Sequence, residues 1–386
     1  MVQKRSEDNK VWYAPNRFQA YGEEEIKAVE ACLRAGWLAP GPLTADFEAK
    51  VAALFGKAHG IMVNSGSSAN LMLANVLDLK GKDVVTPACT FATTVAPLLQ
   101  VGARPVFCDV VAGAYVPTVE AVMDALTPAT VCCCIPNLVG NHFDWAGLRA
   151  ALKAAGRDDV VLWEDSADTI VHTPASDVSI TSFYSSHVIT AGGGGGMVMV
   201  NDEALKLKVL QFRDWGRVGN NSEDFAERFG HEVDGMEYDF KFLYSCVGYN
   251  TKSTEMNAAF GLVQLEKLDG FVAKRKALVK RYLANLAGTR FLLPDNSREP
   301  NWLAFPLMTE NRKSCLQWLE EHHVQTRVCF AGNITRHPAF RHLLEEHPVA
   351  DRIMAQGFLV GAHHGLTEED VDYVCDVLKA WEATQS

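Results

Sequence analysis

The stretch SFYSSHVITAGGGGGMVMV, residues Ser182–Val200, carries the most informative pattern in the sequence. An apolar-leaning strand runs into a turn that holds one histidine, His187, and five consecutive glycines, Gly192–Gly196, lead into a second strand. Glycine tolerates positive φ and lets a ligand approach the backbone closely. No Gly-Lys-Ser or Gly-Lys-Thr follows the glycines, which excludes a P-loop. Taken alone, a single histidine in such a turn is more often a hydrogen-bonded surface residue than a catalytic one.

Short apolar runs alternate with helical segments along the chain before this stretch. Five runs are typical of strands that are covered on both faces: Gly60–Val63, Asp83–Thr86, Pro105–Cys108, Val131–Ile135 and Val160–Trp163. Segments with helical spacing of apolar residues lie around them, such as Glu23–Ala35. The alternation predicts an α/β fold with a mostly parallel central sheet.

A long charged helix is predicted over Leu262–Leu286, and it marks the hinge into a second domain. We expect an irregular N-terminal arm over residues 1–20, a large domain over 21–262, and the hinge helix with a smaller C-terminal α/β domain over 263–386. A terminal helix is predicted over Glu368–Thr384.

Composition and charge exclude several classes of partner. The chain has 386 residues, a net charge of −11 and no long Lys/Arg block, so we expect neither a nucleic-acid nor an anionic-membrane partner. The N-terminus lacks the apolar stretch of a signal peptide, and no apolar run approaches the ~20 residues that span a bilayer. We therefore expect a cytoplasmic protein. The adjacent Cys132, Cys133 and Cys134 are interpreted as buried strand thiols, because side chains alternate faces along a strand.

Two further segments point to a bound ligand. NSGSSAN (Asn64–Asn70) follows a strand and opens a helix, where backbone amides and the helix dipole favour a phosphate; a plain helix cap is the alternative. EDSAD (Glu164–Asp168) follows an apolar strand, and acidic residues at that end of a parallel strand face the ligand crevice. Asp165 can pair with a protonated ring nitrogen, as vitamin B6 enzymes require, or it can cap a helix.

Together with TPACTFATT (Thr86–Thr94), PNLVGN (Pro136–Asn141) and VGYNTKSTEMNAAFGLVQLEKLD (Val247–Asp269), these segments resemble the DegT-type sugar aminotransferase family over nearly the whole chain. The resemblance implies fold type I of the pyridoxal phosphate enzymes, the aspartate aminotransferase-like architecture. In aminotransferases of that family the pattern Ser-Phe-x-x-x-Lys supplies the Schiff-base lysine, and here the sixth residue is His187. That replacement, with RDWGR (Arg213–Arg217), is similar to the branch of nucleotide-linked 4-keto-6-deoxyhexose 3-dehydratases.

The resemblance also implies roles for the other site residues. His187 is the expected catalytic residue, and the cofactor-binding residues are Ser67, Ser68 and Ser182 for the phosphate, Phe91 stacked on the ring, Asp165 at the ring nitrogen, Asp168 near the ring hydroxyl, and Asn250 reaching the phosphate from the neighbouring subunit. The role of Asn250 implies a homodimer with shared active sites.

Two departures from relatives stand out. Gly193 stands where relatives commonly have glutamate. Lys252 stands where they often have arginine, and a lysine cannot form the two parallel hydrogen bonds of a guanidinium group. One dehydratase type also binds an iron–sulfur cluster through cysteines after RDWGR and within the acidic motif. This chain has no cysteine in RDWGRVGNNSEDFAERFG and has Ala167 in EDSAD, so we expect no cluster and no metal.

The expected reaction follows from the missing lysine. Imidazole forms no stable Schiff base, so the resting cofactor is expected to be pyridoxamine 5′-phosphate, held non-covalently. His187 would act as the base and later return the proton as the C3 hydroxyl of the sugar leaves. An amino donor, glutamate, would restore pyridoxamine phosphate from pyridoxal phosphate.

Three alternatives remain open. One is a sugar aminotransferase in which another lysine acts, Lys252 being the nearest candidate. Another is a non-catalytic or regulatory protein of the same fold. The third is a dehydratase that takes electrons from an external donor. The sequence does not identify the nucleotide or the hexose stereochemistry.

Overall fold

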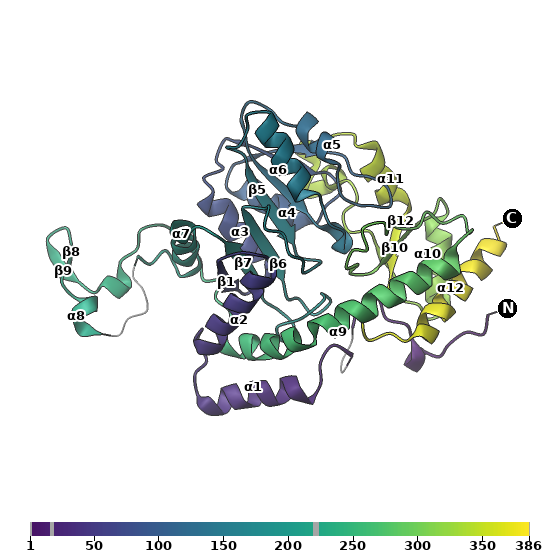
Figure 1. Ribbon diagram of the computed structural model, residues 1–386, viewed down its shortest axis with the longest axis horizontal. Coiled ribbons are helices and arrows are strands. Elements are labelled where there is room, and N and C mark those ends of the chain that lie inside the picture. Colours follow the sequence, from purple (N-terminus) through teal and green to yellow (C-terminus); the bar gives the residue numbers. More distant parts are fainter. Residues whose placement is uncertain (1, 16–18, 219–223, 386) are drawn as a thin grey trace.

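The computed structural model describes residues 2–15, 19–218 and 224–385. Its core is a seven-stranded sheet with the strand order β1-β7-β6-β5-β4-β2-β3 (Figure 1). The strands are β1 (His59–Val63), β2 (Asp83–Pro87), β3 (Arg104–Cys108), β4 (Thr130–Pro136), β5 (Val161–Ser166), β6 (Val178–Ser182) and β7 (Gly196–Val200). Neighbouring strands are parallel except β7, which is antiparallel to both β1 and β6. The predicted α/β fold with a mostly parallel sheet is confirmed.

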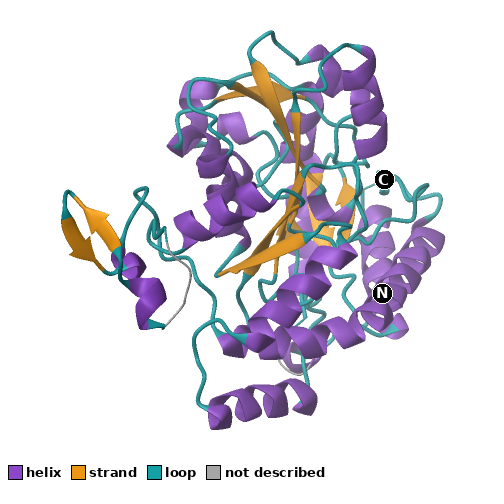
Figure 2. Cartoon of the chain, turned by 60° about the vertical axis from the view of Figure 1, so that its left-hand side comes forward, coloured by secondary structure: helices purple, strands orange, loops and turns teal. Residues whose placement is uncertain are grey.

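Helices cover both faces of this sheet, which is why its strands are apolar on both sides (Figure 2). The helices of this domain are α2 (Pro42–Leu54), α3 (Gly66–Val76), α4 (Ala92–Gln100), α5 (Val119–Asp124), α6 (Trp145–Ala154) and α7 (Glu203–Arg213). The three adjacent cysteines follow the predicted alternation. Cys132 and Cys134 pack in the core beside α3, whereas Cys133 packs in the core beside α6.

Helix α9 (Glu255–Leu286) runs from the large domain into the small one. It therefore begins before residue 262, where the predicted helix and hinge were placed, and α1 (Glu23–Ala35) and α2 pack against it. The bounds of α1 agree with the predicted helix.

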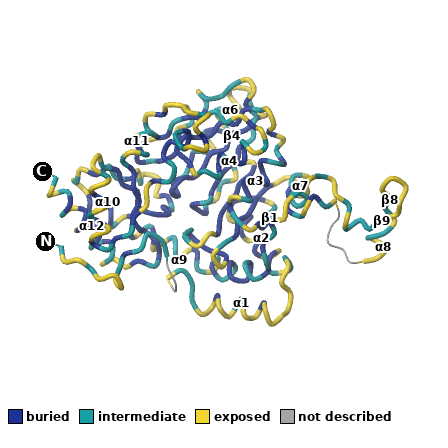
Figure 3. Tube along the Cα trace, turned by 180° about the vertical axis from the view of Figure 1, so that it is seen from behind, coloured by how far each residue is buried: buried dark blue, intermediate teal, exposed yellow. Residues whose placement is uncertain are grey.

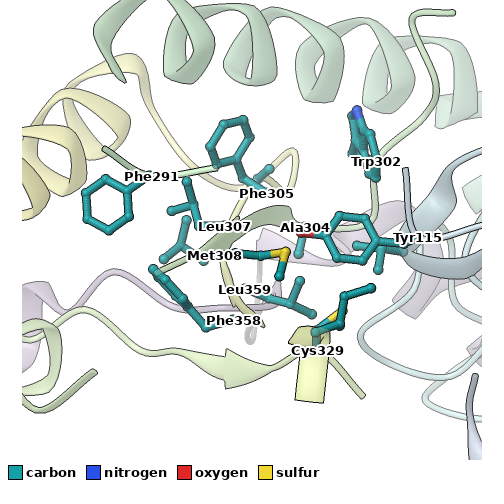
Figure 4. Close-up of a cluster of buried hydrophobic side chains, with 14 of the residues drawn as sticks. Tyr115, Phe291, Trp302, Ala304, Phe305, Leu307, Met308, Cys329, Phe358 and Leu359 are labelled. Atoms are coloured by element: carbon teal, nitrogen blue, oxygen red, sulfur yellow. The ribbon is translucent and has the colours of Figure 1, made fainter. Parts of the chain in front are cut away.

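The small domain contains a three-stranded sheet of order β10-β12-β11, formed by β10 (Phe305–Met308), β11 (Arg327–Val328) and β12 (Gly357–Val360). Its helices are α10 (Arg312–Glu321), α11 (Pro348–Gln356) and α12 (Glu368–Ala383). Phe305 and Leu307 of β10 pack with Phe358 of β12 in the core (Figure 4). The N-terminal arm packs on this domain, because Val11 pairs with the backbone of residues 323–325.

A segment projects from the large domain between α7 and α9. It contains α8 (Phe225–Arg228) and the hairpin of β8 (His231–Val233) and β9 (Met236–Tyr238), whose residues are largely exposed (Figure 3). No helix in the described part of the chain has the length and apolar character to cross a membrane.

Candidate active site

A cavity lies at the carboxyl ends of the central parallel strands, where ligands bind in open α/β sheets. It is lined by Gly66, Ser67, Asn70, Phe91, Thr93, Thr94, Pro136, Asn137, Leu138, Asp165, Ala167, Asp168, Ser182, His187 and Phe330. The chain thus brings six of the eight predicted site residues, all but Ser68 and Asn250, to one cavity.

Asp165 occupies the floor of the cavity at the end of β5. Its Oδ2 accepts hydrogen bonds from Asn70 Nδ2 at 2.8 Å and Thr94 Oγ1 at 2.7 Å. Burial raises the pKa of this carboxyl, and the two side-chain hydrogen bonds oppose the rise. Asp165 is therefore a buried, firmly oriented acceptor that is open to the cavity on one side.

The N-terminus of α3 forms one wall. Ser65 caps the helix by accepting from the Ser68 backbone N–H at 3.0 Å, and the Ser68 hydroxyl donates to Asn64 Oδ1 at 2.6 Å. Ser68 accordingly turns away from the cavity, whereas Ser67 lines it. A Cβ added at Gly66 would lie 2.7 Å from the Ser182 Cβ, so only glycine lets the helix end approach β6 this closely.

His187 stands opposite Asp168 across the cavity. The imidazole Nδ1 lies 3.2 Å from the Ser182 carbonyl oxygen, which leaves Nε2 directed toward Asp168 Oδ1 at 3.8 Å. Asp168 Oδ2 accepts from the Val139 backbone N–H at 2.8 Å. Val139 has φ = 58°, a left-handed conformation that costs energy for a β-branched residue and is often held at functional sites.

Burial favours the neutral form of both groups. It lowers the pKa of His187 to about 4, the Ser182 carbonyl opposes this shift, and the positive charge of Arg275 adds to it. Burial raises the pKa of Asp168 to about 7, against the hydrogen bond from Val139. At neutral pH the imidazole is thus a free base with Nε2 as its available lone pair.

Two aromatic rings stand at the mouth of the cavity. Phe91, at the start of α4, is 51% exposed although it lines the cavity, and its ring meets that of Phe330 edge to face at 6.0 Å. Phe330 comes from the small domain, so both domains form the entrance.

Asn250 and the two departures from relatives lie outside this cavity. Asn250 is exposed and pairs with the backbone of Asp214 at the base of the projecting segment. Lys252 Nζ lies 3.5 Å from Asp214 Oδ2 and 4.3 Å from the centroid of the Trp215 ring. Gly193 lines a second cavity, between α1 and the start of α9. The expected role of Asn250 across a subunit boundary remains a prediction.

Sequence reasoning missed the residues that orient Asp165. Asn70 ends the motif NSGSSAN, and Thr94 ends the motif TPACTFATT. The only signal for their role was that both are polar residues inside segments already assigned to the ligand site. Phe330 had no such signal. No group of three or more His, Cys, Asp or Glu side chains in the described ranges is placed to hold a metal ion.

The chain is similar to known proteins over nearly its whole length. The model of the DegT/DnrJ/EryC1/StrS aminotransferase family matches residues 19–379. The lipopolysaccharide biosynthesis protein RfbH of Salmonella typhimurium is 34% identical, over 93% of this chain and 90% of that protein. A dTDP-4-dehydro-2,6-dideoxy-D-glucose 3-dehydratase of Saccharopolyspora spinosa is 31% identical, over 94% and 85%. A GDP-4-keto-6-deoxy-D-mannose 3-dehydratase of Escherichia coli O55:H7 is 26% identical, over 95% and 99%.

Solved structures establish the fold. The aminotransferase TlmJ from Streptoalloteichus hindustanus superposes with a TM-score of 0.86 at 23% identity, covering 98% of this chain and 100% of that one. The E. coli GDP-4-keto-6-deoxy-D-mannose-3-dehydratase with bound hydrated pyridoxal phosphate gives 0.84 at 24% identity, covering 96% and 100%. The predicted aspartate aminotransferase-like architecture is confirmed.

Proposed function

Because the chain belongs to the DegT/DnrJ/EryC1/StrS aminotransferase family, we propose that it is a pyridoxamine/pyridoxal phosphate-dependent 3-dehydratase of a nucleotide-linked 4-keto-6-deoxyhexose. One observation carries the proposal: His187 lines the cavity, and no lysine is among the lining residues of the described chain. Two relatives named as sugar 3-dehydratases, from S. spinosa and E. coli, support it.

The cavity has the chemistry to hold this cofactor. Ser67, Ser182 and the backbone amides at the N-terminus of α3 would hold the phosphate, since a helix N-terminus favours an anion. Phe91 would cover one face of the ring. Asp165 lines the cavity with Oδ2 oriented by Asn70 and Thr94 and Oδ1 by the Ala167 backbone N–H at 3.2 Å, and it would hold a proton on the ring nitrogen.

When bound, the cofactor supplies the amine that engages the C4 ketone and a ring that accepts electrons. His187 Nε2 would take a proton at the cofactor carbon beside that amine and return it to the departing C3 hydroxyl, which leaves as water. The low pKa of His187 keeps the imidazole ready to accept. Asp168 lies near enough to Nε2 to stabilise the imidazolium that forms.

The proposal includes glutamate as amino donor and a homodimer in which Asn250 reaches the partner's cofactor phosphate. Over one cycle the ketosugar and glutamate become the 3-deoxy ketosugar, 2-oxoglutarate and ammonia. The water released at C3 balances the water that hydrolyses the aminated product.

Incubation of purified protein with pyridoxal phosphate, glutamate and each 4-keto-6-deoxyhexose nucleotide tests the proposal. Ammonia and 2-oxoglutarate should appear in equal amounts with a 3-deoxy product, and His187→Asn should slow the release of both by about 10²–10⁴-fold. An aminosugar that accumulates instead would show an aminotransferase.

A covalent trap separates these two functions at the level of the protein. Borohydride reduction with equimolar pyridoxal phosphate, followed by peptide mass mapping, should modify no lysine in the unchanged chain and should modify position 187 in His187→Lys. A modified Lys252 in the unchanged chain would overturn the proposal.

A further inference from the structure

Arg275, in the second half of α9, is a buried cation without an ion-pair partner among the described residues. The residue is 1% exposed, and within the described residues no carboxylate forms an ion pair with it. Its Nη1 donates to the Leu303 carbonyl oxygen at 2.8 Å and its Nη2 to the His187 carbonyl oxygen at 3.5 Å, while Nε has no partner. Burying a charge that only carbonyl groups stabilise costs folding free energy, so we expect a functional role for Arg275.

The two carbonyls that Arg275 contacts belong to His187, which lines the cavity, and to Leu303, which lies behind it in the chain of contacts that leads to Asp168. The Leu303 N–H donates to the Val139 carbonyl oxygen at 2.8 Å, and the Val139 N–H donates to Asp168 Oδ2 at 2.8 Å. Asp168 Oδ1 in turn faces His187 Nε2 at 3.8 Å. The contacts form a closed ring that begins and ends at Arg275.

The strained residue of the site belongs to this ring. Val139 is held at φ = 58° with both its N–H and its carbonyl engaged, and the neighbouring Gly140 is pressed against residue Asn301, whose carbonyl oxygen would lie 2.2 Å from a Cβ at that glycine. Such a conformation persists only when its surroundings over-determine it.

We propose that Arg275 is a positioning residue that ties the segment carrying His187 to the loop holding Asp168, and thereby sets the imidazole opposite the carboxylate. The inference deepens the proposed function and rests on it for the role of His187. Leu303 lies two residues before the small-domain strand β10, so the ring also couples the small domain to the site.

The charge of Arg275 has a second effect. The charged and titratable groups around His187 are Asp168 across the cavity, Tyr184 with its ring at 6.1 Å, and Arg275 behind the backbone. Arg275 also interacts electrostatically with three other titratable side chains: Tyr13 of the N-terminal arm, and His363 and His364 of the small domain. Arg275 stays protonated at neutral pH and disfavours a second cation beside it, so it helps to keep His187 basic and uncharged.

Histidine ring NMR on the protein without cofactor tests this independently of turnover. With ring-labelled histidine, and His187→Asn to assign the signal, His187 in the unchanged chain should titrate well below its ordinary pKa of ~6.5. In Arg275→Gln its pKa should rise by about one unit, and in Arg275→Lys, which keeps the charge, it should stay near that of the unchanged chain.

Arg312 provides the matched control. Its Nη1 also donates to two backbone carbonyl oxygens, those of Met354 at 2.6 Å and Gly357 at 3.1 Å, away from His187. Arg312→Gln should leave the His187 pKa unchanged. An equal shift in both variants, or none in Arg275→Gln, overturns the proposal. Should Arg275→Gln not fold, an ordinary or raised His187 pKa in the unchanged chain overturns it without any variant.

Kinetics add a readout of position. Arg275→Gln should lower kcat by about 10-fold or more with little change in KM and move the acid limb of the pH–rate profile upward, and Arg275→Lys should restore part of kcat. If no sugar nucleotide is turned over, the NMR result still decides the inference, so its failure is distinct from failure of the proposed function.

Discussion

Replacing Asp168 by asparagine should stabilise the folded chain, and the gain should grow with pH. The carboxyl is buried beside His187 and receives one hydrogen bond, from the Val139 N–H, which the oxygen of asparagine can also accept. Burial raises the pKa of Asp168 from 3.8 to about 7. The Asp168 carboxyl therefore ionises less readily in the folded state than in the unfolded chain.

The sign and size follow from proton linkage. Between about pH 4 and pH 7 the folded chain binds more protons at this site than the unfolded chain, so the stability that Asp168 contributes is full below about pH 4 and is lost as the pH rises through 7. A shift of about three units corresponds to roughly 4 kcal/mol once fully developed, and to a change of roughly 2.5 kcal/mol between pH 5 and pH 8.

Urea unfolding followed by tryptophan fluorescence measures this change. The free energy of unfolding of Asp168→Asn minus that of the unchanged chain should be roughly 2.5 kcal/mol larger at pH 8 than at pH 5. Asp202→Asn, at the exposed N-cap of α7, is the control, because asparagine caps a helix about as well as aspartate. The same difference at both pH values for Asp168→Asn would refute the reasoning.

Three further substitutions separate the roles of residues in the cavity, and a fourth, Gly270→Ala outside it, is the control for the third. His187→Asn should slow ammonia release by about 10²–10⁴-fold while pyridoxal phosphate still binds, as measured by a coupled ammonia assay and equilibrium dialysis; normal turnover would contradict its assignment as the base. Asp165→Asn should instead weaken cofactor binding by about 10- to 100-fold, because a charge-assisted hydrogen bond to the ring nitrogen is lost, and an unchanged dissociation constant in the same dialysis speaks against that contact. Gly66→Ala should destabilise the protein by about 1–3 kcal/mol, since its Cβ would lie 2.7 Å from that of Ser182. The control is Gly270→Ala, on the exposed face of α9 with nothing within 4 Å of the new Cβ, and it should stabilise the protein by about 0.5–1 kcal/mol. Thermal unfolding measures which of the two glycine variants is the more stable, and a more stable Gly66→Ala would rule out the packing argument.

Local sequence patterns were sufficient to predict a helix or strand wherever the segment buries one regular face. Glu23–Ala35 was predicted as a helix because its apolar spacing and the following glycine are local signals, and the observed helix has the same bounds. NSGSSAN was expected to open a helix, and α3 begins inside this motif at Gly66, because the Ser65 side chain caps the helix. Asp165 was expected just beyond its strand and instead lies within the end of β5.

Contacts between distant segments explain what the sequence did not predict. Arg275 stands in a helix rich in Lys and Arg, where a cation ordinarily faces solvent, and only the packing of the small domain buries it. Ser68 was assigned to the phosphate with its neighbour Ser67, but the helix turn directs its hydroxyl to Asn64. The β8–β9 hairpin was not predicted, because its exposed residues bury no face that would impose a pattern.

The N-terminal arm has a consequence for synthesis of the chain. Val11 accepts and donates backbone hydrogen bonds with residues 323–325, and Arg5 binds Asp370 and Tyr373 of α12. At ribosomal rates the arm leaves the exit tunnel roughly 15–60 s before these partners are made. The large domain can fold in that interval, whereas the arm can dock fully only after α12 has been made.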